Sequence, residues 1–308
     1  MGKYIFKRFI TGIITIWAVI TITFFLVRLM PGGPFNGDKM TPEIRANLEM
    51  KYGLDKGLGE QYVTYLKNLT KGDLGESMKF RGRQVSDTIK TTFPKSAKIG
   101  GLAVLLATLL GITLGIVSAL KSGKWPDRLC MFLATLGITI PSFVMSALLI
   151  YVFASKLHLL PTTGYGDIKQ LVMPVIALSA SSTAFITRLT RSKLIEVLKS
   201  DYIRTAKAKG LSKKTVILKH GLRNSLIPVV TYLGPLIAGV LTGSFVVESV
   251  FAIPGLGGEF VSTVTNRDYS ALLGVLVFYS TLIVVCNILV DIMYVIIDPR
   301  IKLDNAKA

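Results

Sequence analysis

The chain has 308 residues, of which 51% are hydrophobic, and a formal net charge of +18. Its mean hydropathy of +0.55 is far above that of a soluble domain, and the apolar residues occur in long runs. These values exclude a soluble enzyme. They also argue against nucleic-acid binding, because most of the basic residues lie in connections between apolar runs, where the inner loops of membrane proteins carry positive charge.

Six apolar runs are each near the roughly 20 residues that a helix needs to cross the hydrocarbon core. They cover about residues 9–29, 99–120, 129–153, 171–187, 226–247 and 271–297. Basic residues precede the first run, separate the second from the third and the fourth from the fifth, and follow the sixth at Arg300 and Lys302. We therefore expect an all-α, multi-pass protein of the cytoplasmic membrane with six transmembrane helices and both termini in the cytoplasm.

The segment that follows the first run is the only region large enough to fold outside the membrane. Residues 42–52 have helical character, residues 61–69 carry a Tyr/Leu stripe at helical spacing, and residues 85–92 form an amphipathic lead-in to the second run. Two roles stay open: a passive cap on the outer face, or a contact surface for an outer partner. The expected division is an N-terminal helix, an outer segment, a permeation core and a tail, at residues 1–30, 31–98, 99–297 and 298–308.

Small residues recur every four positions in the second run. This spacing makes a groove into which another helix can press, and packing within the subunit is favoured over lining of a pathway. The fifth run repeats the pattern more weakly. The residues concerned are Ala103, Ala107, Gly111, Gly115 and Ala119 in the second run, and Gly239 and Gly243 in the fifth.

Prolines interrupt three of the runs and predict kinked helices, because each proline removes a backbone donor. They are Pro141, Pro174, Pro228 and Pro235. Several broken helices in one bundle indicate a pathway or moving parts.

Ionisable groups within the runs are few. We assign Asp291 a structural role, and we expect Glu248, at the outer end of the fifth run, to face polar surroundings. Cys130 and Cys286 suggest neither a disulfide nor a metal site. The chain has no phosphate-binding loop and no protease, esterase or metal motif, so we expect no catalytic residue, no metal and no cofactor bound by this chain.

The most informative stretch is the basic connection between the fourth and fifth runs, residues 188–223, which we call the coupling loop. It contains eleven Lys or Arg and only two acids, Glu196 and Asp201. Asp201 can cap a short helix over 202–209, and Gly210 can end it in the left-handed conformation. A short capped helix on the inner membrane face is expected to be a docking element.

Several motifs resemble bacterial ABC-importer permeases of the peptide/nickel branch, and the resemblance covers the whole chain. Within this branch the chain most resembles the first, or B-type, permease of an oligopeptide or dipeptide importer, because such permeases have a long outer segment after the first span. The motifs are IRTAKAKGL (203–211), HGLRNSLIPV (220–229), GDLG (72–75), PSF (141–143), ESVFAIPGLG (248–257), NRDY (266–269) and DIMYVIIDPRI (291–301), with Arg8–Phe35 matching the first span.

This resemblance implies the type I importer permease fold and a defined set of partners: a second, C-type permease, two cytoplasmic ATPase subunits that hold ATP and magnesium, and an extracytoplasmic binding protein. It implies that the coupling helix enters a groove on an ATPase. The residues assigned to this contact are Glu196, Asp201, Tyr202, Arg204, Thr205, Ala206, Lys207, Gly210 and Leu211.

The broader importer signature begins Glu-Ala-Ala, and here Arg204, Thr205 and Ala206 stand at those positions. The acid is absent, so a salt bridge made by that glutamate in other importers is not expected. Relatives in this branch carry dipeptides, longer peptides, nickel chelates and other small solutes, and the cargo stays open among them. The alternatives of a different class are an ion-gradient-driven transporter, which would need midplane acids, and a membrane enzyme, which would need catalytic residues.

Overall fold

The computed structural model describes the backbone of residues 2–30, 33–35, 41–241 and 243–297, with side chains described for 6–30, 33–35, 41–241 and 243–290. Asp291 and the expected tail, with Arg300 and Lys302, lie outside this description of side chains. The described residues are almost entirely helical, and their extended structure is limited to one bridge between Glu76 and Gln84. The expectation of an all-α membrane protein is confirmed.

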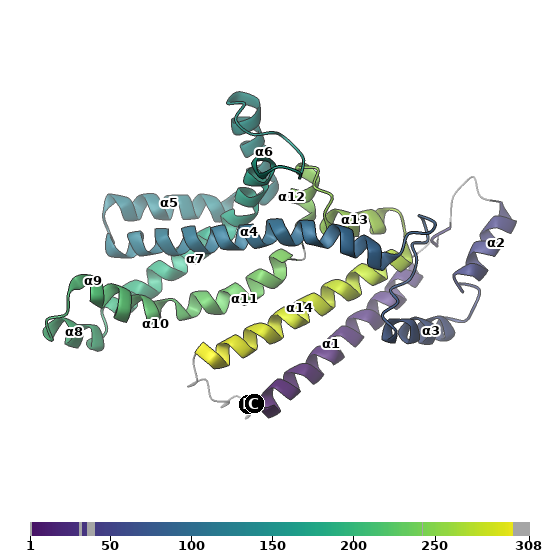
Figure 1. Ribbon diagram of the computed structural model, residues 1–308, viewed down its shortest axis with the longest axis horizontal. Helices are drawn as coiled ribbons and strands as arrows, with labels where there is room; N and C mark the ends of the chain where they lie inside the picture. Colours follow the sequence, from purple (N-terminus) through teal and green to yellow (C-terminus); the bar gives the residue numbers. More distant parts are fainter. Residues whose placement is uncertain (1, 31–32, 36–40, 242, 298–308) are drawn as a thin grey trace.

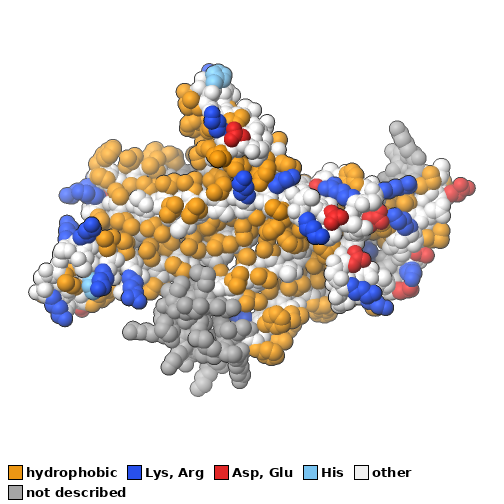
Figure 2. Space-filling model, in the orientation of Figure 1, with side chains coloured by type: hydrophobic (Ala, Val, Ile, Leu, Met, Phe, Trp, Pro, Cys, Tyr) orange, Lys and Arg blue, Asp and Glu red, His pale blue; other side chains and the backbone are white. Residues whose placement is uncertain are grey.

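Four described helices are long and apolar enough to cross a membrane: α1 (Gly2–Leu29), α4 (Val85–Leu120), α7 (Ile168–Leu198) and α14 (Tyr269–Ile297). Two bent pairs bring the number to six if each pair is one span. α1 and α14 lie side by side, and α4 packs along α7 (Figure 1). In Figure 2, hydrophobic side chains cover the middle of the molecule, as a bilayer-embedded surface requires, and many Lys and Arg side chains gather at the two ends.

The third expected span is not a single helix. α5 (Trp125–Thr139) and α6 (Ser142–Leu149), which continues as the π-helix η1 (Ile150–Lys156), meet at an angle of 110°. Pro141 has no N–H to continue the ladder, and it forces Ile140 into an extended conformation with ψ of 117°. By contrast, Pro174 lies inside α7 without ending it.

The outer segment contains α2 (Pro42–Lys51) and α3 (Leu58–Thr70). The aromatic stripe of α3 packs on α1: Tyr62 and Tyr65 contact the Phe24 ring, and the Tyr62 hydroxyl lies 2.6 Å from Thr21 Oγ1. A second attachment is made by Asp268, which is 2% exposed. Its carboxylate accepts hydrogen bonds from the Met78 and Ala271 N–H groups, so it caps α14 and holds the loop before α4 at the same time.

α4 is a single helix of 36 residues that begins within the outer segment. The expected boundary between residues 98 and 99 therefore falls inside a continuous helix. The amphipathic lead-in 85–92 and the second span are one element, with buried positions at Val85, Ile89 and Ile99 that face the core.

The chain after α7 turns back at the end of the molecule that lies opposite α2 and α3 (Figure 1). α8 (Asp201–Ala208), α9 (Lys213–Thr215), the π-helix η2 (Val216–Leu222) and α10 (Arg223–Ser225) precede α11 (Ile227–Leu241), which bends by 45° from the preceding helices. α12 (Phe245–Val250) and α13 (Leu256–Thr265) then lead to α14. The fifth expected span thus ends at Leu241 rather than at residue 247.

Candidate functional site

The first third of the coupling loop is helical. α7 continues eleven residues past the expected end of its span, to Leu198. Glu196 therefore lies in the last turns of α7, exposed, with Lys193 Nζ 2.8 Å from its carboxylate. It is not part of the short helix that follows.

The short helix, α8, begins one residue earlier than the capping signal suggests. Ser200 is the N-cap, with φ of −70° and ψ of 156°, and Asp201 is the first helical residue. The assignment of Asp201 as the cap is therefore wrong. Its carboxylate sits in the first turn, where it suits the helix dipole, and it pairs with Arg204 at 3.3 Å.

α8 ends at Gly210 in the left-handed conformation, as the sequence predicts. Gly210 has φ of +78°. Its N–H bonds to the Lys207 carbonyl at 3.0 Å, and the Leu211 N–H bonds to the Ala206 carbonyl at 3.3 Å. These two bonds form a Schellman cap, which fixes where the helix stops and how the chain leaves it.

α8 has one face fixed to the protein and one face free. Ile203 is fully buried and Ala206 is 7% exposed, and both pack on Val216 and Val197. Ala206 thus packs inside its own chain, so its assignment to a direct contact with an ATPase is not supported by the geometry. The outward face consists of exposed side chains: Asp201, Tyr202, Arg204, Thr205 and Lys207, with Leu211 just beyond the helix.

A polar tie joins α8 to the beginning of the fifth span. Asn224 Nδ2 donates a hydrogen bond of 2.9 Å to the Tyr202 hydroxyl. Together with the contact between Ile203 and Val216, it attaches α8 to the elements that lead into α11. α8 is therefore held both to α7 and to the elements that lead into α11.

A buried ion pair lies where α4, α5 and α7 meet, at the end of the molecule opposite α2 and α3 (Figure 1). Arg191 donates from Nε and Nη2 to the two oxygens of Asp127, at 2.7 and 2.8 Å. Asp127 also accepts hydrogen bonds from the Ser118 hydroxyl and from the Gly123 N–H. Its side chain is only 6% exposed, and its partners come from α7, from α4 and from the turn between α4 and α5, so it clamps these three helices together.

Gly111 and Gly115 of α4 lie where α4 packs against α7. A Cβ atom at Gly111 would lie 2.7 Å from Ile186 Cβ, and one at Gly115 would lie 2.5 Å from Thr190 Cβ. Ala107 is fully buried in the same seam. Glycine is thus required by the distance between the two backbones.

The two glycines of the fifth run have other surroundings. A Cβ atom at Gly239 would meet nothing within 4 Å, so Gly239 does not form a packing groove. Gly243 lies beyond the end of α11 with φ of +86°, and a Cβ atom there would lie 2.5 Å from Glu248 Oε1. Both assignments to a helix-packing stripe are therefore corrected.

Glu248 faces polar groups, as the sequence suggests, and these groups form a buried cradle around its carboxylate. It is 3% exposed, Ser96 Oγ donates to it at 2.7 Å, and the Gly258 N–H donates at 3.0 Å. Gly243 and Gly255 leave the space that the carboxylate fills. The cradle joins α4 to α12 and α13.

Comparison with known proteins agrees with this geometry. Residues 111–303 match the family model of the binding-protein-dependent transport system inner membrane component, and residues 1–99 match the model of the N-terminal part of such components. The chain belongs to this permease family. It is thus a multi-pass permease of the inner membrane.

The permease has relatives over nearly its full length. It is 46% identical to the oligopeptide transport system permease protein OppB of Haemophilus influenzae, over 98% of this chain and 100% of the relative. It is 45% identical to the dipeptide transport system permease protein DppB of Bacillus subtilis, over 98% and 99%.

Solved structures share its fold. The MetNI methionine ABC transporter in inward-facing conformations matches with a TM-score of 0.57 and 15% identity, over 68% of this chain and 96% of that chain. An amino acid ABC transporter crystallised with histidines matches with a TM-score of 0.55 and 18% identity, over 68% and 94%. The fold is therefore that of ABC-importer permeases.

Two interactions of this permease could not be predicted from its sequence: the ion pair of Asp127 with Arg191 and the hydrogen bond of Ser96 with Glu248. Asp127 and Arg191 are 64 positions apart, and Ser96 and Glu248 are 152 apart. The sequence did contain two signals. Asp127 is an acid in an otherwise basic connection, and Glu248 is followed within ten residues by three glycines. Neither signal identifies the partner in the chain.

Proposed function

We propose that this permease is the transmembrane subunit of an ATP-driven ABC importer for peptides. The observation that carries the proposal is the full-length similarity to an oligopeptide and a dipeptide permease at 46% and 45% identity. In this proposal the chain forms half of the pathway, a second permease forms the other half, and an extracytoplasmic binding protein delivers the peptide. Two ATPase subunits hold ATP and magnesium, and this chain has no ATPase site of its own.

The free face of α8 is the proposed contact with an ATPase. It lies at the opposite end of the molecule from α2 and α3 (Figure 1). Backbone geometry sets the two ends of α8. The buried face of α8 packs on α7 and on η2, which leads through α10 into α11. Closure of the ATPases would then move α8 as a rigid piece and shift the two spans between inward-open and outward-open states.

The test is reconstitution in proteoliposomes. Peptide uptake is expected only when the second permease, both ATPases, ATP on their side and the binding protein are present. A proton or sodium gradient should not replace ATP, and Asp291→Asn should leave substantial transport. Gradient-driven uptake by this chain alone, abolished by Asp291→Asn, would instead identify an ion-coupled transporter.

The end of α8 gives a prediction about coupling. Gly210→Pro should leave the permease in the membrane but reduce recovery of the ATPases by about tenfold or more, because proline excludes a positive φ. Gly210→Asn is the matched control, since asparagine tolerates the left-handed conformation and should retain most of the recovery. Pull-down of the ATPases with each variant measures the effect. Normal recovery and normal peptide-stimulated hydrolysis with Gly210→Pro would reject α8 as the docking element.

Orientation in the membrane gives a second prediction, tested in a background with Cys130 and Cys286 replaced by alanine. Single cysteines at Lys67 and Lys79 should react with an impermeant thiol reagent added outside intact cells. Ser77 is unsuitable for this purpose because it is 3% exposed.

Cysteines at the exposed inner positions Lys199 and Lys213 should react only after the membrane is opened. Labelling of Lys213 in intact cells would overturn the model with both termini inside.

A further inference from the structure

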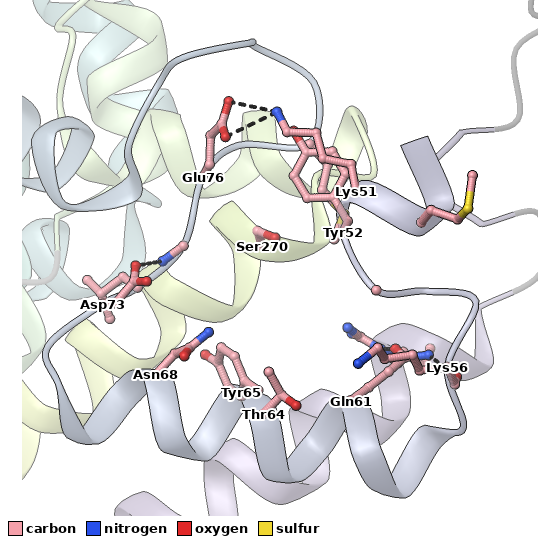
Figure 3. A pocket seen from close by; sticks show the side chains of 16 residues that line it. Lys51, Tyr52, Lys56, Gln61, Thr64, Tyr65, Asn68, Asp73, Glu76 and Ser270 are labelled. Atoms are coloured by element: carbon pink, nitrogen blue, oxygen red, sulfur yellow. Dashed lines mark hydrogen bonds and ion pairs between the residues drawn. The ribbon is translucent and has the colours of Figure 1, made fainter. Parts of the chain in front are cut away.

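The outer segment contains a pocket that the proposed transport mechanism does not use. It is a cavity of about 440 Å³ between the end of α2, one face of α3, the loop 73–78 and the beginning of α14 (Figure 3). That volume lies within the range of roughly 300–1,000 Å³ typical of small-molecule sites. Among the residues that line it are Arg28, Lys51, Tyr65, Asn68, Asp73 and Glu76.

Arg28 gives one wall a positive charge, and no acid among the described residues pairs with it. Arg28 donates from Nε to the neutral Gln61 side chain at 2.7 Å and lies 4.1 Å from the centroid of the Phe24 ring. Its Nη1 atom is enclosed and has no hydrogen-bond partner among the described residues. A half-buried guanidinium that no carboxylate among the described residues neutralises favours an anion in the adjoining pocket, because burying an uncompensated charge is costly.

A second unpartnered group lies beside the first. The Tyr65 hydroxyl is enclosed and has no hydrogen-bond partner among the described residues. Burial raises the pKa of the Tyr65 phenol, so the hydroxyl stays protonated near neutral pH and can donate. Figure 3 shows Tyr65 and Asn68 projecting from α3 toward the pocket. Arg28 and Tyr65 together can hold a carboxylate.

Two acids, Asp73 and Glu76, also line the pocket. Glu76 is occupied: it accepts from the Gly82 N–H at 2.7 Å and pairs with Lys51 at 3.3 Å. The Gly82 N–H and Lys51 hold the pKa of Glu76 below its usual range. Asp73 accepts only the Gly75 N–H, at 2.8 Å, and has no cationic partner among the described residues. Asp73 is therefore free to receive an ammonium group.

We infer that this pocket binds a zwitterionic ligand of the short-peptide class, with its carboxylate at Arg28 and Tyr65 and its ammonium group toward Asp73. The charges identify a zwitterion, and the choice of a peptide rests on the proposed function. The permease thus has a receiving site on its own outer segment, separate from the binding protein.

Binding is measured with the permease pair and ATPases in nanodiscs, without the binding protein, which would itself take up peptide. The probes are dialanine, its C-terminal amide and N-acetyl-dialanine, titrated by calorimetry. Dialanine is expected to bind, and the amide to bind about tenfold or more weakly, because it loses the charge-assisted bond to Arg28.

Variants with matched controls locate the site. Arg28→Gln and Tyr65→Phe should each weaken dialanine binding. Arg45→Gln, at an exposed position of α2, and Tyr62→Phe, on the same helix as Tyr65, should not. Tyr65→Phe removes a single oxygen atom, so it serves as the decisive variant if Arg28→Gln folds poorly.

The ammonium end has its own test. Asp73→Asn should weaken the binding of dialanine but not of N-acetyl-dialanine, which has no ammonium group. Asp55→Asn, at an exposed position of the same segment, should change neither.

Two results overturn the inference: no dialanine binding to the wild-type complex at millimolar concentration, or equal binding by Tyr65→Phe. ATP-driven uptake by the complete system is measured in parallel. Normal uptake without pocket binding rejects the pocket alone. Pocket binding without any ATP-driven peptide uptake rejects the proposed function and leaves the zwitterion site standing.

Discussion

Gly115→Leu is expected to destabilise the assembled permease by about 3 kcal/mol, at the upper end of the range for overpacked cores. A Cβ atom at Gly115 would already lie 2.5 Å from Thr190 Cβ and 2.8 Å from the Thr187 carbonyl oxygen. Leucine adds three further carbon atoms in the same place. The backbones of α4 and α7 must then separate, which should lower the melting temperature and the yield of the detergent-extracted complex.

The same helix supplies the control. A side chain at Gly101 would meet nothing within 4 Å, so Gly101→Leu should leave both measurements near the wild-type values. If Gly115→Leu keeps the wild-type melting temperature and only transport falls, the glycine stripe faces the pathway and not α7.

Asp127→Ala is expected to cost about 3–5 kcal/mol, because removal of one partner leaves the other charge without compensation. Arg191 would lose both of its bonds to Asp127, and the Ser118 hydroxyl and the Gly123 N–H would lose their acceptor. The measurement is again thermal unfolding of the extracted complex, together with ATPase activity stimulated by peptide. Both should fall, since the clamp holds the helix that leads into α8.

The exposed pair between Asp201 and Arg204 is the matched control. Its side chains are 95% and 75% exposed, so Asp201→Ala should change stability by less than about 1 kcal/mol. If Asp127→Ala proves as mild as Asp201→Ala, the ion pair does not hold α4, α5 and α7 together.

Long apolar helices could be predicted from the sequence because their signal is local and extended. α1, α4, α7 and α14 all lie where apolar runs of sufficient length occur. The breaks could not be predicted equally well. Pro141 ends a helix and Pro174 does not, although each removes one donor, because the outcome depends on whether neighbouring elements hold the helix straight.

In the candidate site, too, the local features could be predicted from the sequence and the long-range contacts could not. The end of α8 could be predicted at Gly210, because a Schellman cap is specified by a few neighbouring residues. The buried face of α8 could not be predicted, because Ala206 is covered by Val216, which belongs to a separate element, η2. The Asp127 clamp and the Glu248 cradle require the fold itself, since no local pattern specifies a partner 64 or 152 positions away.

The continuity of α4 has a mechanical consequence. At 1.5 Å per residue its 36 residues span about 54 Å, well beyond the roughly 30 Å of the hydrocarbon core. Its first turns are joined to α12 and α13 through Ser96 and Glu248, and its other end reaches Ser118 and the Asp127 clamp. The helix is unbroken between Ser96 and Ser118, so α4 can act as one rigid element. A displacement of its first turns would then move the Asp127 clamp, where the coupling loop begins, without a change in the conformation of any loop.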